Sequence, residues 1–277
     1  MDSELKSRLD YALSLSQKAG LLAMKHYQGV LQIEKKADES LVTNADKEIE
    51  KILRKEIEKI FPKDGIVGEE FGIQSPKNKS SSSYTWTLDP IDGTTSFSLG
   101  VPFFGVLIGV MDENLSPLVG VCHFPALDET AYAIRGGGTF HKKPDSKDYL
   151  PCRVSKKNTL SESLVCHSGE EHFRKVHLEQ NAKALFQKAE LVRTWGDSYG
   201  HLLVATGRAE MMLDPVFKIW DLIPVKIVVE EAGGFCPGGP FKKAPPDQAA
   251  FNLMKEPLWG VSSNGVLKKE LIKGFQI

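Results

Sequence analysis

The 277-residue sequence has few cysteines and no long run of apolar residues. Its four cysteines are scattered and include no CxxC pair, which argues against a disulfide framework and favours free thiols in a reducing compartment. No stretch approaches the roughly 18–20 apolar residues that are needed to cross a bilayer. The N-terminal segment MDSELKSRLD is charged from its start and does not fit a secretory signal. We therefore expect a soluble, cytoplasmic protein without a membrane partner.

A surplus of charge of one sign is also lacking. Lysine and arginine total 35 and aspartate and glutamate total 36, for a formal net charge of −1. Proteins that bind nucleic acid usually carry a clustered basic surplus. We therefore expect no nucleic-acid partner and a small-molecule partner instead. With 41% hydrophobic residues, the chain can bury a sizeable core in one large or two medium domains.

Hydrophobic spacing indicates both helices and strands. Apolar residues recur with a helical period over residues 3–28 and again from Asn44, a suitable N-cap, to Pro62, which ends the second helix. The polar segment Gln74–Ser83 is expected to be a surface loop. Strand-like segments with turns between them follow in YTWTLDPIDGT, VPFFGVLIGVMD and PLVGVCHFP. Farther along, one helix is expected over residues 171–189, and another begins in WDLIPVK.

Four acidic residues each stand at the end of an element beside a turn, namely Glu69, Asp89, Asp92 and Asp221. Two residues separate Asp89 from Asp92, and one of them is a proline that stiffens the link. A strand that ends in this turn can direct both carboxylates and the Ile91 carbonyl to one place. Oxygen ligands of this kind suit Mg²⁺, and without a cation the gathered carboxylates would repel one another. The pattern therefore predicts a divalent cation site.

The residues after Asp92 suggest what the cation site does. Gly93 lets the backbone approach an anion closely, and Thr94 adds a hydroxyl that can orient a water molecule with Asp46 as its acidic partner. The expected chemistry is in-line displacement at phosphorus by a metal-activated water, with metals about 3.5–4 Å apart. Each residue alone has a simpler reading, because Asp-Gly-Thr is a common turn, Asp221 can be an N-cap and Asp46 can stabilise its helix dipole. Only their joint occurrence supports the cation site.

A rival phosphatase motif is excluded by spacing. Haloacid-dehalogenase-type phosphatases carry DxDGT after an apolar strand, and their first aspartate attacks phosphorus. Here two residues, one of them proline, separate Asp89 from Asp92, which would misdirect such a nucleophile.

Four stretches in order resemble the inositol monophosphatase superfamily: LVTNADKEIE, GEEFG, WTLDPIDGTTSF and WDLIPVKIVVEEAGG. The resemblance spans about residues 10–265, nearly the whole chain. It implies an α/β (α+β) fold, a layered αβαβα sandwich of the inositol monophosphatase/fructose bisphosphatase type. It also implies two to three Mg²⁺ per active site, a small phosphomonoester substrate, sensitivity to lithium and a homodimer.

The resemblance implies roles residue by residue. The implied metal ligands are Glu69, Asp89, Asp92, Asp221 and the carbonyl of Ile91. The residues implied in catalysis are Asp46, Thr94 and Glu69. The implied phosphate cradle is Gly93, Thr94 and Thr95. The residues implied to contact the rest of the substrate are Asp92, Asp197, Asp214 and Asp221.

The stretch TWGDSYGHLLVATGRAEMMLDPVFKIWD resembles the histidinol-phosphatase branch, in which Gly-Asp is followed closely by Tyr. Asp197 and Asp214 suit the ammonium and imidazole of histidinol phosphate, although Asp197 can also be a helix N-cap. We expect a histidinol-phosphate phosphatase of histidine biosynthesis. The alternatives are an inositol-1-monophosphatase or a broad sugar-phosphate or nucleotide phosphatase of the same superfamily, and a relative that keeps the fold as a binding module. That last reading predicts lost metal ligands.

Composition and two minor motifs complete the expectations. A change in composition over residues 142–157 suggests an N-terminal α+β domain of residues 1–145 with most metal ligands and a C-terminal α/β domain of residues 146–277. His167 and His172 lack the HExxH spacing of a zinc site and are expected at a solvent-facing helix start. The glycines at 136–138 open no helix and are expected to form a turn near the mouth of the site.

Overall fold

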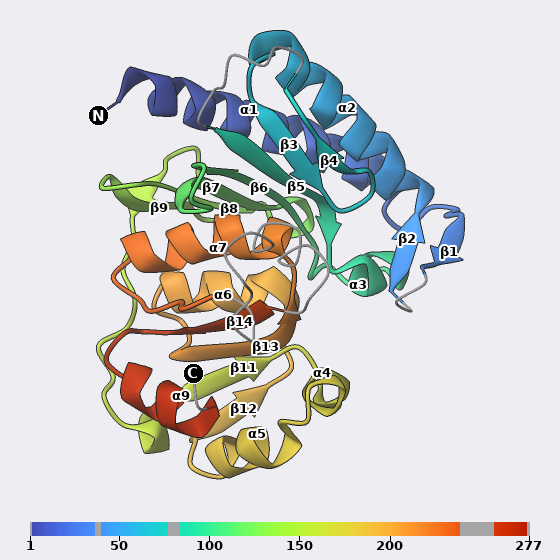
Figure 1. Cartoon of the computed structure of the whole chain (residues 1–277). Coiled ribbons are helices and arrows are strands. Elements are labelled where there is room, and N and C mark those ends of the chain that lie inside the picture. Colours follow the sequence, from blue (N-terminus) through green and yellow to red (C-terminus); the bar gives the residue numbers. More distant parts are fainter. Residues whose placement is uncertain (1, 37–39, 77–83, 239–257, 276–277) are drawn as a thin grey trace.

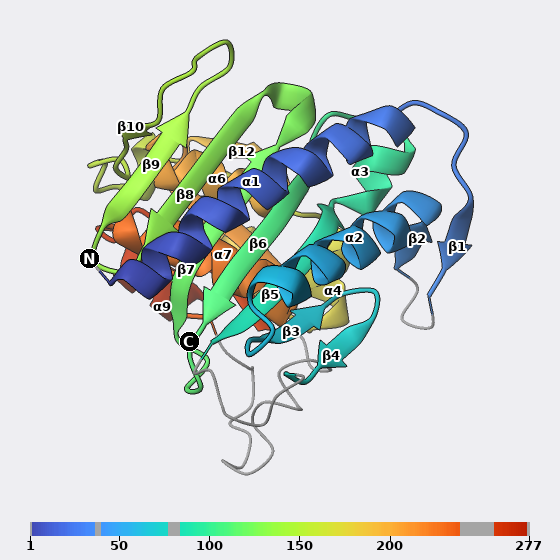
Figure 2. The ribbon, with the colours of Figure 1, turned by 90° about the horizontal axis from the view of Figure 1, so that it is seen from above.

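The computed structural model describes residues 2–36, 40–76, 84–238 and 258–275, and its helices and sheets alternate in five layers (Figure 1). The first layer holds α1 (Ser3–His26) and α2 (Asn44–Ile60), which lie across the larger sheet in Figure 2. The described strands of this second layer, in spatial order, are β10 (Leu150–Pro151), β9 (Gly138–Lys142), β8 (Glu129–Ile134), β7 (Pro117–Phe124), β6 (Gly105–Met111), β5 (Thr85–Asp92), β3 (Gly65–Gly68) and β4 (Gly72–Gln74).

The other three layers come from the C-terminal half of the chain. The middle layer holds α6 (Asp197–Ala205) and α7 (Ile219–Glu231). The smaller sheet has the order β12 (Leu191–Arg193), β11 (Leu164–His167), β13 (Met211–Phe217) and β14 (Leu258–Ser263) among the described strands. The outer helices are α4 (Glu170–Lys175), α5 (Glu179–Phe186) and α9 (Lys268–Phe275). The expected αβαβα sandwich is confirmed.

Short elements connect the layers. The structure contains the two-stranded ladder β1 (Ile33–Lys35) and β2 (Leu41–Thr43), the short helix α3 (Thr94–Ser98) and the 3₁₀ turns η1 (Pro125–Leu127) and η2 (Leu160–Glu162). None of the helices in the described ranges is both long and apolar enough to span a bilayer.

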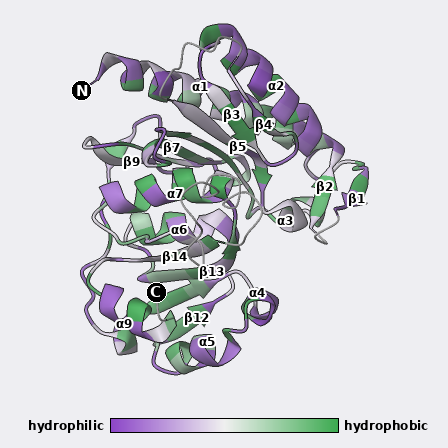
Figure 3. Cartoon of the chain, viewed as in Figure 1, coloured by the Kyte–Doolittle hydropathy of each residue, from purple (hydrophilic) through white to green (hydrophobic). Residues whose placement is uncertain are grey.

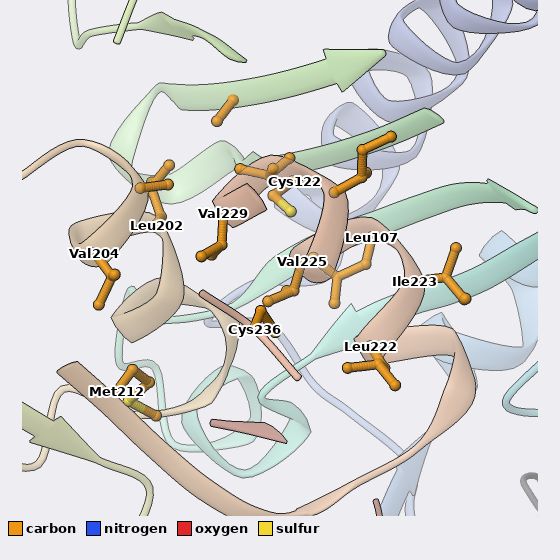
Figure 4. Packing of buried hydrophobic residues seen from close by; sticks show 14 of the residues in the cluster. Leu107, Cys122, Leu202, Val204, Met212, Leu222, Ile223, Val225, Val229 and Cys236 are labelled. Carbon is orange, nitrogen blue, oxygen red and sulfur yellow. The ribbon is translucent and has the colours of Figure 1, made fainter. Parts of the chain in front are cut away.

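Helix α7 is the centre of the main core. Its sequence is hydrophobic around most of its circumference, and Figure 3 shows hydrophobic residues over much of α7 but hydrophilic residues over much of α2. A helix of this kind is buried on all sides. In Figure 4, Val225 and Val229 of α7 pack with Leu107 and Cys122 of the larger sheet and Leu202 of α6. This packing fixes the N-terminus of α7 against the end of β5.

Two expectations about local structure need correction or stay open. The helix expected over residues 171–189 is two helices, α4 and α5, because the chain turns at His177, which has φ 59°. In that turn the N–H of Leu178 donates to the carbonyl of Phe173 at 2.9 Å, which ends α4. Most of the expected surface loop Gln74–Ser83 lies outside the described residues. The division into domains at residues 145 and 146 stays a prediction, and β10 beyond it still pairs with β9.

Candidate functional site

Three buried aspartates from two elements meet where β5 ends. Asp89 and Asp92 close β5, and Asp221 is the third residue of α7. One carboxylate oxygen from each lies within 4.8 Å of the others, and the residues are only 2%, 9% and 8% exposed. The ladder between β5 and β6 shifts register between Asp89 and Asp92, which bends the strand at this point. Asp221 lies 129 residues after Asp92 in the sequence. The two acids converge because α7 packs on the sheet that contains β5.

The aspartates strongly perturb one another. Burial and the neighbouring carboxylates raise the pKa of Asp89 and that of Asp221 well above the usual value. Burial raises the pKa of Asp92 to about 6, against hydrogen bonds from Ser198 that lower it. A divalent cation would remove the repulsion, and hard cations such as Mg²⁺ prefer carboxylate and carbonyl oxygens. The donor set therefore fits such a cation.

The turn after Asp89 brings further predicted residues together. The Oδ1 atom of Asp89 accepts the N–H of Ile91 at 3.0 Å, and the Thr94 hydroxyl donates to the Ile91 carbonyl at 3.0 Å. The same hydroxyl lies 3.4 Å from Oδ1 of Asp46. Asp46 is fully buried at the start of α2, and burial raises its pKa although hydrogen bonds from Thr43 oppose the rise. The pair Thr94 and Asp46 is thus in contact beside the aspartates.

The N-cap of α2 is Thr43 rather than the expected Asn44. The Thr43 side chain accepts from the backbone of Ala45 and Asp46, and the Asp46 carboxylate accepts from the Thr43 N–H at 2.8 Å. This reciprocal capping leaves Oδ1 of Asp46 to face Thr94. Helix capping therefore orients the carboxylate that the sequence had singled out.

Glu69 follows β3 and lies near the three aspartates without joining their 4.8 Å group among the described residues. Its Oε1 atom is 2.7 Å from Nζ of Lys36, which also contacts Glu70 at 2.7 Å. Burial raises the pKa of Glu69 to about 7, although Lys36 lowers it. Burial lowers the pKa of Lys36, but the two glutamates outweigh this and raise it above its usual value. The Glu69 charge also contributes to the raised pKa of Asp89, which shows that the two carboxylates are neighbours.

Gly93 turns the chain from β5 into α3. Its φ is 78°, in the region that favours glycine, and a Cβ there would lie 2.8 Å from the Phe103 carbonyl and 2.9 Å from Oδ2 of Asp197. Thr94 and Thr95 follow as the first residues of α3, where helical geometry leaves the backbone N–H groups without intrahelical partners. Gly93 therefore permits an approach of α6 that another residue would block.

Two acids that the sequence analysis assigned to the substrate lie beyond Asp92. Asp197 is the first residue of α6, has φ 53° and follows the N-cap Gly196, so it is not the N-cap itself. Burial, with Asp92 and Asp214 nearby, raises the pKa of Asp197 well above its usual value. Asp214 on β13 is 3% exposed and contributes to the raised pKa of Asp92. The acids expected to bind metal and those expected to contact the substrate thus lie close enough to interact with one another.

Sequence reasoning missed residues that support this site. Ser198 donates its N–H to Oδ2 of Asp92 at 2.9 Å, and its hydroxyl contacts the same oxygen. Glu50 and Lys36 hold the segment around Glu69, and His172 contacts Asp214. No local pattern marks these residues, because each meets its partner only through packing between elements.

Two minor expectations were wrong. His167 is not at a solvent-facing helix start but is 6% exposed on β11, where it stacks on Phe186 with a ring distance of 4.8 Å. The glycine turn at 136–138 does not lie near the site, because the N–H groups of Gly136 and Gly138 donate to Glu231 at the far end of α7 from Asp221. Both expectations rested on local sequence and ignored how the sheets stack.

Comparison with known proteins adds to this geometry. The sequence matches the inositol monophosphatase family over residues 4–243. It is 41% identical over 229 residues to a histidinol-phosphatase of Chlorobaculum parvum, covering 82% of this chain and 84% of that protein. It is 33% identical over 227 residues to a histidinol-phosphatase of Mycobacterium tuberculosis, covering 80% and 84%. The fold is similar to that of the Thermotoga maritima IMPase, with a TM-score of 0.79 and 29% identity over 98% of this chain and 97% of that one.

Proposed function

Since the chain belongs to the inositol monophosphatase family and is a phosphomonoester hydrolase, we propose that its substrate is L-histidinol phosphate. The reaction releases L-histidinol and phosphate in histidine biosynthesis. Similarity to the histidinol-phosphatases of two bacteria supports this choice of substrate. The geometry of the substrate-side acids supports it independently.

The observation that carries the proposal is the pair Asp197 and Asp214. Burial raises the pKa of Asp197, and the negative charges of Asp92 and Asp214 raise it further, although His172 lowers it. A substrate with an ammonium and an imidazole supplies positive charge and forms charge-assisted hydrogen bonds. The hydroxyls of a neutral polyol such as inositol can donate hydrogen bonds to these carboxylates, but they supply no positive charge. The acidic surroundings therefore favour a cationic alcohol.

We propose that Asp89, Asp92, Asp221, Glu69 and the Ile91 carbonyl hold Mg²⁺. Three of the carboxylates are close enough to share one cation, and their raised pKa values show what deprotonation costs without one. Bound Mg²⁺ supplies charge neutralisation of the phosphate and lowers the pKa of a water molecule. Deprotonated carboxylates at pH 7 are then the stable form.

The chain's own residues would position the reactants. The Thr94 hydroxyl lies within reach of both the Ile91 carbonyl and Asp46. When it donates to Asp46, its oxygen can accept a hydrogen bond from the attacking water, so that it takes up the water proton as it passes its own proton to Asp46. The buried Asp46 fixes that hydroxyl and can receive the proton. The N–H groups of Gly93, Thr94 and Thr95 at the start of α3 would cradle the phosphate. Ser198 keeps Asp92 in place through two hydrogen bonds.

The alternative substrate class is a neutral sugar phosphate, above all inositol 1-phosphate. The family name and the fold similarity to an IMPase favour it, but the acidic substrate side does not. A role as a binding module without turnover predicts that ligand acids are missing. All four acids are present, and three of them converge.

Side-by-side kinetics test the proposal. We expect kcat/KM for histidinol phosphate to exceed that for inositol 1-phosphate, fructose 1,6-bisphosphate and adenosine 3′,5′-bisphosphate by about tenfold or more. A preference of that size for inositol 1-phosphate would replace the first choice by the alternative. Release of no phosphate from any ester in the presence of Mg²⁺ would favour the binding module.

Three further properties are proposed from family membership alone, namely two to three cations per site, inhibition by lithium and a homodimer. A cytoplasmic location is proposed from the sequence, whose four scattered cysteines suit a reducing compartment. Size-exclusion chromatography with light scattering tests the dimer, and titration with LiCl in the Mg²⁺-dependent assay tests the inhibition. The domain division at residues 145 and 146 is likewise a proposal, which limited proteolysis can examine.

A further inference from the structure

His172 on α4 contacts the substrate-side acid Asp214. Its Nδ1 atom lies 3.1 Å from Oδ1 of Asp214, and the N–H of Val216 donates to the same oxygen at 3.1 Å. Among the described residues, no hydrogen bond reaches the second oxygen of Asp214. Asp214 is therefore held through one oxygen and offers the other to a ligand.

The two partners differ in how far solvent reaches them. The side chain of His172 is 24% exposed, whereas that of Asp214 is 4% exposed. Solvent therefore reaches the imidazole more readily than the carboxylate that it contacts. Because the imidazole is partly exposed, its hydrogen bond with Asp214 can weaken or break without disturbing the core.

The charged groups that affect the pKa of His172 most are acidic, although its own helix also carries Arg174 and Lys175. The acidic groups are Asp214 on β13, Asp197 on α6 and Glu171 on its own helix. Burial lowers the pKa of His172, but the hydrogen bond and charge of Asp214 outweigh burial and raise it above the usual value. When it is protonated, the imidazole is a cation beside Asp214, Asp197 and Glu171, which we call the acidic corner.

We propose that His172 is a specificity residue that serves as an internal counter-cation for Asp214 and competes with the cationic group of the substrate. This inference rests on the proposed function, because it takes the substrate's ammonium to be the competitor. Protonated His172 occupies Asp214 and repels an ammonium. Neutral His172 still donates its Nδ1–H to Oδ1 but carries no charge, so the ammonium meets the full charge of the acids.

The competition predicts the direction in which substrate preference changes with pH. Preference for an ammonium-bearing ester over a matched neutral ester rises as pH increases through the pKa of His172. Asp197 also gains charge as pH rises, and this contributes in the same direction. A variant that cannot protonate at position 172 but keeps Asp197 separates the two contributions.

The variant is His172→Asn, whose amide can donate from nearly the place of Nδ1 and stays neutral. His177→Asn is the matched control, because His177 is exposed and outside the acidic corner, and asparagine tolerates its positive φ. The probes are histidinol phosphate and its N-acetyl derivative, which share the phosphate and the imidazole and differ in the ammonium. The two esters titrate differently, because the ammonium lowers the pKa of the neighbouring imidazole. These titrations are the same for every protein variant, so they cancel when the ratio of kcat/KM values in His172→Asn is divided by the ratio in the wild type at each pH.

From about pH 5.5 to 8, we expect the ratio in the wild type and in His177→Asn to rise by about fivefold or more. His172→Asn is expected to start from a higher ratio at the acidic end and to rise less. Superimposable profiles for His172→Asn and the wild type would overturn the inference. If instead the wild type shows no preference for the ammonium ester at any pH, the proposed substrate class fails and not the role of His172 alone.

A binding measurement needs no variant. In an NMR titration of the wild-type protein, saturation with L-histidinol should lower the pKa of His172, because two cations that compete for Asp214 weaken one another reciprocally. An unchanged or raised pKa of His172 in the presence of L-histidinol would contradict the competition.

Discussion

The buried carboxylate of Glu50 accepts the backbone N–H of Glu70 at 2.7 Å, so a side chain of α2 fixes the chain directly after Glu69. Its other oxygen accepts the N–H of Phe71 at 3.2 Å and the Nε–H of Arg54 at 2.7 Å. A side chain that orients a metal-ligand candidate in this way belongs to the site although it touches no substrate.

Replacing Glu50 by glutamine tests this support. The amide keeps the shape but turns one acceptor oxygen into a donor, which leaves a buried N–H unpaired at a cost of about 1–3 kcal/mol in unfolding free energy. Misplacement of Glu69 should also weaken Mg²⁺ binding by about tenfold. Urea unfolding and isothermal titration calorimetry measure the two effects. Glu48→Gln on the exposed side of α2 is the control, and equal Mg²⁺ affinity in both variants would refute the positioning role.

A comparison of alanine substitutions at Gly93 and Gly72 separates the cost of a positive φ from the cost of a steric clash. Gly72 has φ 63° with no atom within 4 Å of an added Cβ, whereas a Cβ on Gly93 would collide with Phe103 and Asp197. We expect Gly72→Ala to cost about 1–2 kcal/mol of stability from the positive φ alone. Gly93→Ala should cost about 1–3 kcal/mol more and should lower kcat. Equal losses in urea unfolding would show that the neighbours of Gly93 move aside freely.

Asp197→Asn tests whether the carboxylate of Asp197 recognises a cationic substrate. Asparagine tolerates the positive φ of Asp197, so the fold should remain intact. Loss of the charge should raise KM for histidinol phosphate by about tenfold or more and leave KM for p-nitrophenyl phosphate nearly unchanged. Asp145→Asn, at an exposed position with φ 60°, is the matched control. Similar increases for both esters would mean that Asp197 supports the metal site rather than the choice of substrate.

What the sequence could predict was local or strongly periodic. The turn after β5 was visible because Asp89, Pro90, Asp92 and Gly93 lie within five residues, and the turn's chemistry depends on its own neighbours. The long helices α1 and α2 were visible from their apolar period. The family resemblance then supplied the order of the layers.

What the sequence could not show was contact across layers. Ser198 is 106 residues from the carboxylate of Asp92 that it contacts, and His172 is 42 residues from that of Asp214. Serine before a tyrosine and histidine in a polar helix carry no signal of such partners. The break at His177 was equally hidden, because His177 has a positive φ although no glycine or proline in residues 171–189 marks a turn there.

The acid cluster predicts how pH affects stability without a cation. Folding raises the pKa of Asp92 to about 6 and that of Glu69 to about 7, so the folded state binds more protons than the unfolded state. The unfolding free energy in EDTA should therefore fall as pH rises from about 4 to 7, and saturating Mg²⁺ should abolish the fall. Urea unfolding in EDTA and in Mg²⁺ across this range measures both curves. A cation-free curve that rises through the window would contradict the raised pKa values.

Asp92→Asn tests the same cluster with a variant. The amide keeps an acceptor oxygen for Ser198 but removes a carboxylate that is deprotonated at pH 8 at a cost of the order of 2–3 kcal/mol, so the cation-free variant should be more stable than the wild type at that pH. The same change should remove the Mg²⁺-dependent rise in stability and the turnover, because one anionic ligand is lost. Greater stability together with lost activity separates a functional charge from a structural one. Metal-dependent turnover that survives in Asp92→Asn would place the cation away from the end of β5.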